Sequence, residues 1–325
     1  MQGNGLTIWA ESPEEARIFI DKAYNNGFRH FISAIYVAKR SPKNRSNDYV
    51  DGEYYCTSND PLNIQVYTTV IVAPPAIIAL VQWCTCDIMI SRGDIPIAVL
   101  EDTTHMVRMN VYQRVPRLFR AAILGVPALC LQGTRGLNFD LRGDCWAMHR
   151  YIRAFAAISR LHPNTAVLPF CYIPTQAGDE AAKERMAFEY LDALVTGDVV
   201  RAQEIRRSAI AELNDISTNG YLGQIAPDIN SIEVLPHAVT VHIGAKPDVK
   251  SWEAKGSGQM DPYIGMIAAA KYIYCFDAIG AQVRKMRVRF TFLKPDFWWF
   301  QNYQTSRSLY KTLAFQIADE VEFAG

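Results

Sequence analysis

Several signatures of secreted and membrane proteins are missing from this sequence. The seven cysteines are odd in number, follow no framework spacing and in several cases lie in apolar runs, which is typical of reduced thiols inside a cell. The N-terminus lacks a basic segment followed by an apolar run, so no secretory signal is expected. No apolar run reaches the roughly eighteen residues that a membrane span needs. We therefore expect a cytoplasmic protein without a membrane partner.

Motifs of three common chemistries are also missing. The sequence has no Gly-x-Ser-x-Gly motif, which argues against serine hydrolase chemistry, and no Walker sequence, which argues against nucleotide binding. Cys84 and Cys86 lack a second pair or nearby histidines at zinc spacing, so a structural zinc is not expected. The Gly133–Gly136 loop follows a predicted buried strand and is interpreted as a simple turn.

The overall composition is that of an ordinary globular protein. Half of the 325 residues are hydrophobic, and 33 basic side chains balance 33 acidic ones. The order of strand-like and helix-like segments predicts an α/β fold, in which helices flank a central mixed β-sheet. We expect an α/β core over residues 1–176. A helical and β-rich C-terminal region over 177–325 either forms a separate unit or continues the core.

Local patterns predict most of the helices and strands. Ser12, Pro13 and Glu15 form an N-terminal helix signature, and Gly27 is expected to end that helix. The other expected elements are strands at 28–37, 62–72, 95–103, 126–131, 166–173 and 283–293, a strand pair at 231–244, an extended run at 76–91 that turns at 92–94, a long loop at 39–61, and helices at 110–124, 146–161, 264–278 and 305–320, with two more between 179 and 214.

Two acidic residues lie on the predicted hairpin. If the turn is centred on Asp94, Asp87 and Glu101 lie opposite each other, with Cβ atoms about 5 Å apart. Two carboxylates that close repel each other unless a cation lies between them, and oxygen ligands of this kind suit Mg²⁺. Thr103 shares the face of Glu101, because side chains alternate along a strand. The alternative is an edge hairpin whose two acids are exposed to solvent.

Arginine is concentrated in one part of the chain. Between His105 and Arg160 there are nine arginines, two acids and no lysine. Such a one-sided stretch predicts a positive patch, and arginine suits bidentate contact with phosphate. The helix at 110–124 carries its polar side chains at spacings of three or four, which places them on roughly one face: Gln113, Arg114, Arg117 and Arg120. Alternatively, some arginines pair with acids elsewhere, such as those of 179–204.

The order of these features resembles the PD-(D/E)XK nuclease superfamily, to which type II restriction endonucleases belong. The resemblance covers residues 83–132: an acid, a hairpin, a Glu-x-x segment, a helix with Gln-Arg-x-x-Arg, and a short buried strand. It implies a restriction-endonuclease-like core that cleaves double-stranded DNA sequence-specifically. Asp87 and Glu101 would bind Mg²⁺ and, with Thr103, form the catalytic site. Cys86 stands where the family often has Pro, and Thr103 where it usually has Lys.

The resemblance leaves several further expectations. A homodimer is expected, because cutting both DNA strands needs two sites. Arg135, Lys255 and Arg287, the last on the basic strand, are further expected DNA contacts. Glu253 and Lys255 form an intact Glu-x-Lys and are a second candidate for the catalytic site. The alternative function is a non-catalytic DNA-binding or regulatory protein on the same scaffold, in which Thr103 marks lost activity.

Overall fold

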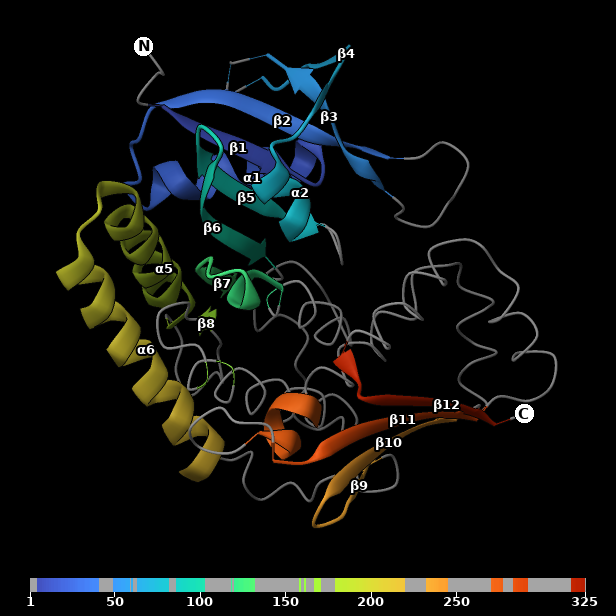
Figure 1. The fold of residues 1–325 in the computed structure, drawn as a ribbon. Helices are drawn as coiled ribbons and strands as arrows, with labels where there is room; N and C mark the ends of the chain where they lie inside the picture. Colours follow the sequence, from blue (N-terminus) through green and yellow to red (C-terminus); the bar gives the residue numbers. More distant parts are fainter. Residues whose placement is uncertain are drawn as a thin grey trace, which may run out of the picture.

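Two β-sheets organise the chain (Figure 1). The structure is a computed structural model, and it describes residues 5–40, 49–58, 60, 63–81, 86–102, 118, 120–131, 158, 161, 167–170, 179–219, 232–244, 270–276, 283–291 and 317–324. Within these residues a large sheet has the strand order β4-β3-β2-β1-β5-β6-β7-β8, and a small sheet has the order β12-β11-β10-β9. The expected α/β class with a mixed central sheet is confirmed.

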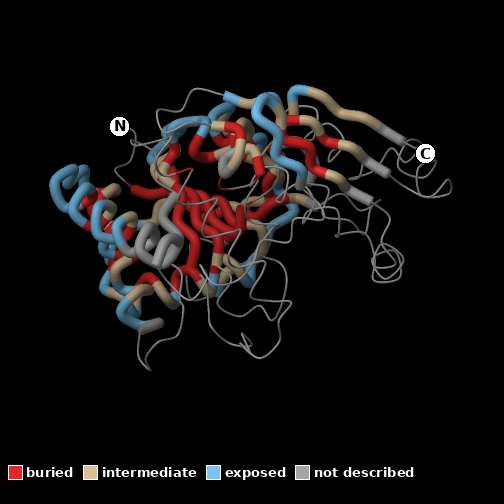
Figure 2. The backbone as a smooth tube through the Cα atoms, turned by 90° about the horizontal axis from the view of Figure 1, so that it is seen from below, coloured by how far each residue is buried: buried red, intermediate tan, exposed pale blue. Residues whose placement is uncertain are grey.

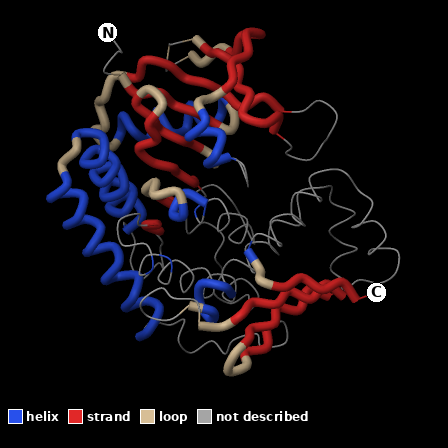
Figure 3. The backbone as a smooth tube through the Cα atoms, viewed as in Figure 1, coloured by secondary structure: helices blue, strands red, loops and turns tan. Residues whose placement is uncertain are grey.

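The large sheet and its helices contain the following elements. Its strands are β1 (Leu6–Ala10), β2 (Ile32–Arg40), β3 (Tyr49–Thr57), β4 (Val66–Val72), β5 (Ile88–Arg92), β6 (Ile95–Asp102), β7 (Ala128–Leu131) and β8 (Val167–Phe170). The helices are α1 (Pro13–Asn25), α2 (Pro75–Val81), α5 (Asp179–Thr196) and α6 (Val199–Asn219). The helices flank the sheet (Figure 3), so the layered arrangement predicted from the sequence is present.

The direction of β5 decides which strand ends meet. Strands β1, β2, β6, β7 and β8 run parallel to one another, whereas β5 is antiparallel to both of its neighbours, β1 and β6. The carboxyl ends of β1, β6 and β7 therefore lie at the same edge as the amino end of β5. This edge, marked by Ala10, Ile88, Asp102 and Leu131, is termed the carboxyl edge below.

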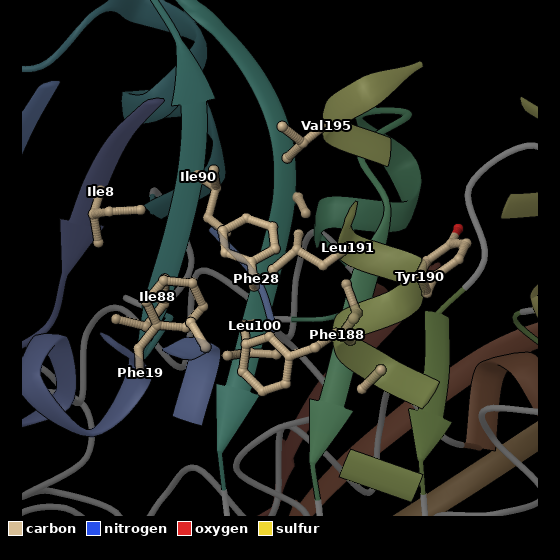
Figure 4. Packing of buried hydrophobic residues seen from close by; sticks show 14 of the residues in the cluster. Ile8, Phe19, Phe28, Ile88, Ile90, Leu100, Phe188, Tyr190, Leu191 and Val195 are labelled. Atoms are coloured by element: carbon tan, nitrogen blue, oxygen red, sulfur yellow. The ribbon is translucent and has the colours of Figure 1, made fainter. Parts of the chain in front are cut away.

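One face of the large sheet is buried by α1 and α5. Phe19 of α1 packs between Phe28 and Phe188, with ring centroids 6.4 and 5.9 Å away (Figure 4). Ile88 and Leu100 supply the sheet side of the same buried cluster, which also takes in residues of α6. The interior of the sheet is almost entirely buried (Figure 2). The buried cluster thus extends past residue 176 and includes residues of α5 and α6.

The opposite face carries aromatic side chains and α2. Trp9 packs against Tyr36 and Tyr54, and its indole Nε1 donates a hydrogen bond to Ser91 Oγ at 2.9 Å. Helix α2 closes over β3 at Gly52, where a Cβ would lie 2.5 Å from Cγ1 of Ile78. Gly52 also has φ +73°, so both the backbone and the close approach of α2 favour glycine.

The small sheet lies in the C-terminal part of the chain. Its strands are β9 (Ile232–Val234), β10 (Ala238–Gly244), β11 (Lys285–Thr291) and β12 (Glu320–Ala324), and the π-helix η3 (Lys271–Cys275) packs against it. The expected strand pair around Pro236 and the basic strand are both present. No helix among the described ranges combines the length and apolar character that crossing a membrane requires.

Some local predictions are confirmed. Ser12 Oγ accepts the backbone N–H of Glu15 at 3.1 Å and begins α1, as the capping signature predicts. Gly93 has φ +58°, in the hairpin turn predicted at 92–94, and Gly197, φ +75°, separates α5 from α6. Of the helices predicted at 110–124 and 146–161, the structure describes residues 118, 120–124, 158 and 161, and all of these are helical except Leu124, which lies in a turn.

Other local predictions are wrong. Residues 39–61 were expected to be a loop but contain β3, which pairs with β2 and β4 and whose Val and Tyr side chains favour a strand despite the polar residues around them. The extended run predicted at 76–91 begins instead with α2, since Pro75 suits the first helical turn and a short apolar run fits either structure. Strand β1 was not predicted, and β12 begins where the last predicted helix was expected to end.

Phe19 gives a direct test of the core that joins α1 to α5. Its side chain is 1% exposed, so Phe19→Ala should lower the free energy of unfolding by about 3 to 5 kcal/mol, through lost burial and a residual cavity. Phe31→Ala is the matched control, because Phe31 is 75% exposed and its loss should change stability by less than about 0.5 kcal/mol. Urea unfolding of the three proteins measures both values; equal losses would contradict this packing.

Candidate functional site

The β5–β6 hairpin brings Asp87 and Glu101 together at the carboxyl edge. Ile88 pairs with Leu100, so one residue further along Asp87 lies opposite Glu101. The backbone N–H of Asp87 donates to Oε1 of Glu101 at 3.2 Å, and the backbone N–H of Asp102 donates to Oδ2 of Asp87 at 2.8 Å. Each carboxylate therefore accepts a main-chain hydrogen bond from the other strand.

Both acids are buried. Asp87 is 2% exposed and Glu101 is fully buried, so the alternative of a solvent-facing acid pair is wrong. Ile88 and Leu100 belong to the cluster under α1 and α5, and because side chains alternate, Asp87 and Glu101 lie on the opposite face. A buried carboxylate is costly unless it is hydrogen-bonded or paired, and two neighbouring ones also repel each other. The two main-chain hydrogen bonds offset part of that cost.

Residues missed by the sequence analysis surround the acid pair. The backbone N–H of Glu11, directly after β1, donates to the carbonyl oxygen of Asp87 at 2.9 Å. Cys130 of β7 is the register partner of Glu101 and is buried. Burial raises the pKa of the Tyr54 hydroxyl well above its ordinary value of 10, and the nearby Cys86 and Glu11 raise it further. Recognising β1 would have placed Glu11 at this edge.

An ion pair lies behind the site, on the α1 face of the sheet. Nζ of Lys22 lies 2.6 Å from Oδ2 of Asp102, whose own N–H holds Asp87. Lys22 also lies 3.5 Å from Oε2 of Glu184 on α5, and Asn26 Nδ2 donates to Oε1 of Glu184 at 2.7 Å. The carboxyl edge is thus connected to both helices that cover the core.

The donor set of the site suits one kind of metal ion. Within the described ranges no group of three or more His, Cys, Asp or Glu side chains is arranged to hold a metal. Asp87 and Glu101 offer two carboxylates, and Mg²⁺ is commonly held by one or two carboxylates while keeping several waters. A carboxylate has about four acceptor positions, so a main-chain hydrogen bond to one oxygen is compatible with metal binding. The pair therefore fits a hydrated Mg²⁺ ion and does not suit structural zinc.

Most of the remaining predicted site residues lie outside the part of the chain that the structure describes: Thr103, Gln113, Arg114, Arg117, Arg135, Glu253 and Lys255. Arg120 is described and half-buried, and its Nε donates to the carbonyl oxygen of Ala79 in α2 at 2.9 Å. Burial lowers the pKa of the Arg120 guanidinium. This contact gives Arg120 a structural role, because it joins the segment after the hairpin to α2.

Arg287 lies in a ladder of opposite charges on the small sheet. Lys285, Arg287 and Arg289 share one face, as predicted, while Met286 and Val288 are buried on the other. The charged partners come from β12: Arg287 lies 2.7 Å from Glu320 and 3.3 Å from Glu322, and Arg289 lies 2.7 Å from Glu322. The basic strand is therefore substantially neutralised, and the DNA contact expected of Arg287 stays a prediction.

Comparison with known proteins identifies no relative: no protein-family profile, no curated protein and no solved structure matches the chain. The resemblance over residues 83–132 therefore stays a prediction that rests on the chain's own residues and topology.

The charge ladder predicts a pH dependence. The hydrogen bond from Arg289 lowers the pKa of Glu322 below its ordinary value of 4.5. Because the folded pKa is lowered, this pairing should stabilise the fold fully above about pH 4.5 and lose its contribution as the pH falls through the folded pKa. An NMR titration of the Glu322 carboxyl should give a lower midpoint in the native protein than in Arg289→Met. Identical midpoints would contradict the pairing.

Proposed function

We propose that this protein is a Mg²⁺-dependent endonuclease that hydrolyses phosphodiester bonds in double-stranded DNA, of the sequence-specific restriction type. The observation that carries the proposal is the pair of buried carboxylates, Asp87 and Glu101, held opposite each other at the carboxyl edge. Buried carboxylates at neighbouring positions are costly without compensation, and a bound divalent cation offsets their repulsion.

The topology around the pair supports the same proposal. The chain passes from Asp87 through the antiparallel β5–β6 hairpin to Glu101, and then through a long connection to β7, parallel to β6. Residues 120–123 of that connection are helical. This order of acid, hairpin, acid, helix and parallel strand is the one that the resemblance to the PD-(D/E)XK superfamily implies. The carboxyl ends of parallel strands are also where open α/β sheets commonly bind ligands.

The proposed chemistry assigns separate roles to the chain's residues. When bound, Mg²⁺ supplies stabilisation of developing charge and a coordinated water of lowered pKa. Asp87 and Glu101 would hold the ion, and the main-chain N–H groups of Asp87 and Asp102 orient the two carboxylates. Thr103 takes the position of the usual lysine. Arg114 and Arg117, with the neighbouring Gln113, would bind the phosphates of the DNA strand.

A second function is favoured by one observation. Each acid of the pair already accepts a main-chain hydrogen bond, so the pair also joins the ends of β5 and β6 structurally. With Thr103 at the lysine position, the same scaffold suits a DNA-binding or regulatory protein without nuclease activity. In either case we propose a cytoplasmic protein, and a homodimer for the nuclease, because one copy supplies one acid pair.

Cleavage of DNA tests the catalytic proposal. The native protein should cleave some sequences in a mixed duplex DNA preparation with Mg²⁺. Asp87→Asn or Glu101→Gln should lower the rate at least about 100-fold, a loss as large as that caused by removing one preorganised hydrogen-bond donor from an active site. Both replacements keep a carbonyl oxygen that can accept the main-chain N–H. Cleavage products separated by electrophoresis give the rates.

Asp94→Asn is the control for these variants, because Asp94 is an exposed acid on the same hairpin, in the turn at its opposite end. Its rate should equal that of the native protein. Full activity in Glu101→Gln would contradict the placement of the site. No cleavage by the native protein of any DNA would leave the regulatory function as the better description.

The salt dependence of DNA binding tests both functions. Logarithmic affinity for a mixed duplex should fall linearly with logarithmic salt concentration, because bound arginines release counterions from the phosphates. Replacing Arg114 and Arg117 by Ala should reduce the slope by about 2. Arg201→Ala is the control, since Arg201 pairs with Glu189 on the α5–α6 surface. A flat salt response of the native protein would argue against DNA as the partner.

A further inference from the structure

Asp102 connects the two faces of the large sheet at the carboxyl edge. Its backbone N–H donates to Oδ2 of Asp87 on one face, at 2.8 Å. Its side chain points to the other face, where Oδ2 accepts a hydrogen bond from Nζ of Lys22 at 2.6 Å. The contact with Lys22 thus fixes the orientation of Asp102, and the N–H group oriented in this way makes the contact with Asp87.

The Lys22 side of this connection is anchored in the core. Lys22 lies in the last turn of α1, whose Phe19 and Ile20 are buried against the sheet. Glu184 of α5 lies 3.5 Å from Lys22, so two helices converge on the pair. The side chains of Lys22 and Asp102 are only 15% and 6% exposed. An ammonium group held in this way has little freedom to move.

Stability does not by itself explain a charged pair at this position. The neighbouring residues on the same face, Leu100 and Leu131, belong to the apolar cluster. Replacing a buried ion pair by apolar side chains of similar volume is often neutral or stabilising, because desolvation of the two charges offsets their attraction. The pair therefore requires an explanation that depends on the orientation of its groups. The hydrogen bond from the Asp102 N–H to Asp87 provides such an explanation.

We propose that Lys22 and Asp102 form a positioning pair, which holds the Asp102 N–H so that the Asp87 carboxylate is oriented toward the cation on the other face of the sheet. This inference rests on the proposed function, since it assigns Asp87 to a metal ion. Groups that orient a metal ligand without touching the metal commonly change metal affinity by about 10- to 100-fold when they are removed. Lys22 would act on the site from the far side of the sheet.

Mn²⁺ as a spectroscopic substitute for Mg²⁺ separates positioning from a purely structural role. Its affinity can be measured by electron paramagnetic resonance on the full chain, without DNA, alongside urea unfolding. The urea concentration at the midpoint of unfolding should be at least as high for the double variant Lys22→Met/Asp102→Leu as for the native protein. The double variant should nevertheless bind Mn²⁺ about 10- to 100-fold more weakly. Arg201→Met/Glu189→Leu removes an ion pair between α5 and α6 and should leave Mn²⁺ affinity unchanged.

Three single variants keep the test decisive if the double variant does not fold. Asp102→Asn keeps the backbone N–H and the side-chain size but weakens the ion pair, so it should lower Mn²⁺ affinity. Lys22→Arg keeps the charge and should retain affinity better than Lys22→Met. Native affinity in the folded double variant, or in both Asp102→Asn and Lys22→Met, would overturn the positioning pair.

Failure of the proposed function would be distinguishable from failure of this inference. If the native protein binds no Mn²⁺, or if Asp87→Asn binds it as well as the native protein does, the assignment of Asp87 to a metal is wrong and the positioning pair falls with it. If Asp87→Asn abolishes binding while Lys22→Met/Asp102→Leu binds normally, the metal site stands and the positioning pair alone is rejected.

Discussion

The register of β5 against β6 is the constraint on which the candidate site depends. Because side chains alternate along a strand, a slip of one residue would turn the two acids toward different faces of the sheet. Beyond the turn at Gly93, a register shift between Ile90 and Ser91 brings Ile88 opposite Leu100 and so sets that register. The main-chain N–H groups at the strand ends then bond the carboxylates of Asp87 and Glu101 instead of continuing the ladder.

Burying two carboxylates has an energetic cost, and the main-chain hydrogen bonds to Asp87 and Glu101 offset part of it. Strand β7 is buried throughout, β5 is buried except at Arg92, and β6 is buried over residues 98–101, so the acids lie at the end of a buried region. Helices α1 and α5 cover one face, and their Lys22 and Glu184 lie beside the edge where the acids sit. Packing and polar contacts therefore converge on the same strand ends. That convergence distinguishes this edge from the turn end of the hairpin, where Asp94 is exposed.

Charge behaves differently in the two parts of the chain. The basic strand β11 looks like a phosphate-binding surface when it is read alone, because Lys285, Arg287 and Arg289 share a face. In the fold, Glu320 and Glu322 of β12 lie beside Arg287 and Arg289, so that face carries charges of both signs. The stretch between His105 and Arg160 contains nine arginines and only two acids in its own sequence. It remains the better prediction for DNA contact.

The sequence by itself determined the features that depend on near neighbours in the chain. These are the capped helix α1, the position of the hairpin turn, and the break between α5 and α6. The opposition of Asp87 and Glu101 was predicted from that turn, but in the structure it also requires the register shift between Ile90 and Ser91. Tertiary structure decided the rest, because it depends on residues far apart in the chain. Residues 49–57 form a strand because they pair with β2 and β4. Asp87 and Glu101 are buried by the packing around the large sheet. The charge of Arg287 is balanced by acids of β12. The contact between Lys22 and Asp102, 80 residues apart, exists only because α1 packs on the face of the large sheet on which Asp102 lies.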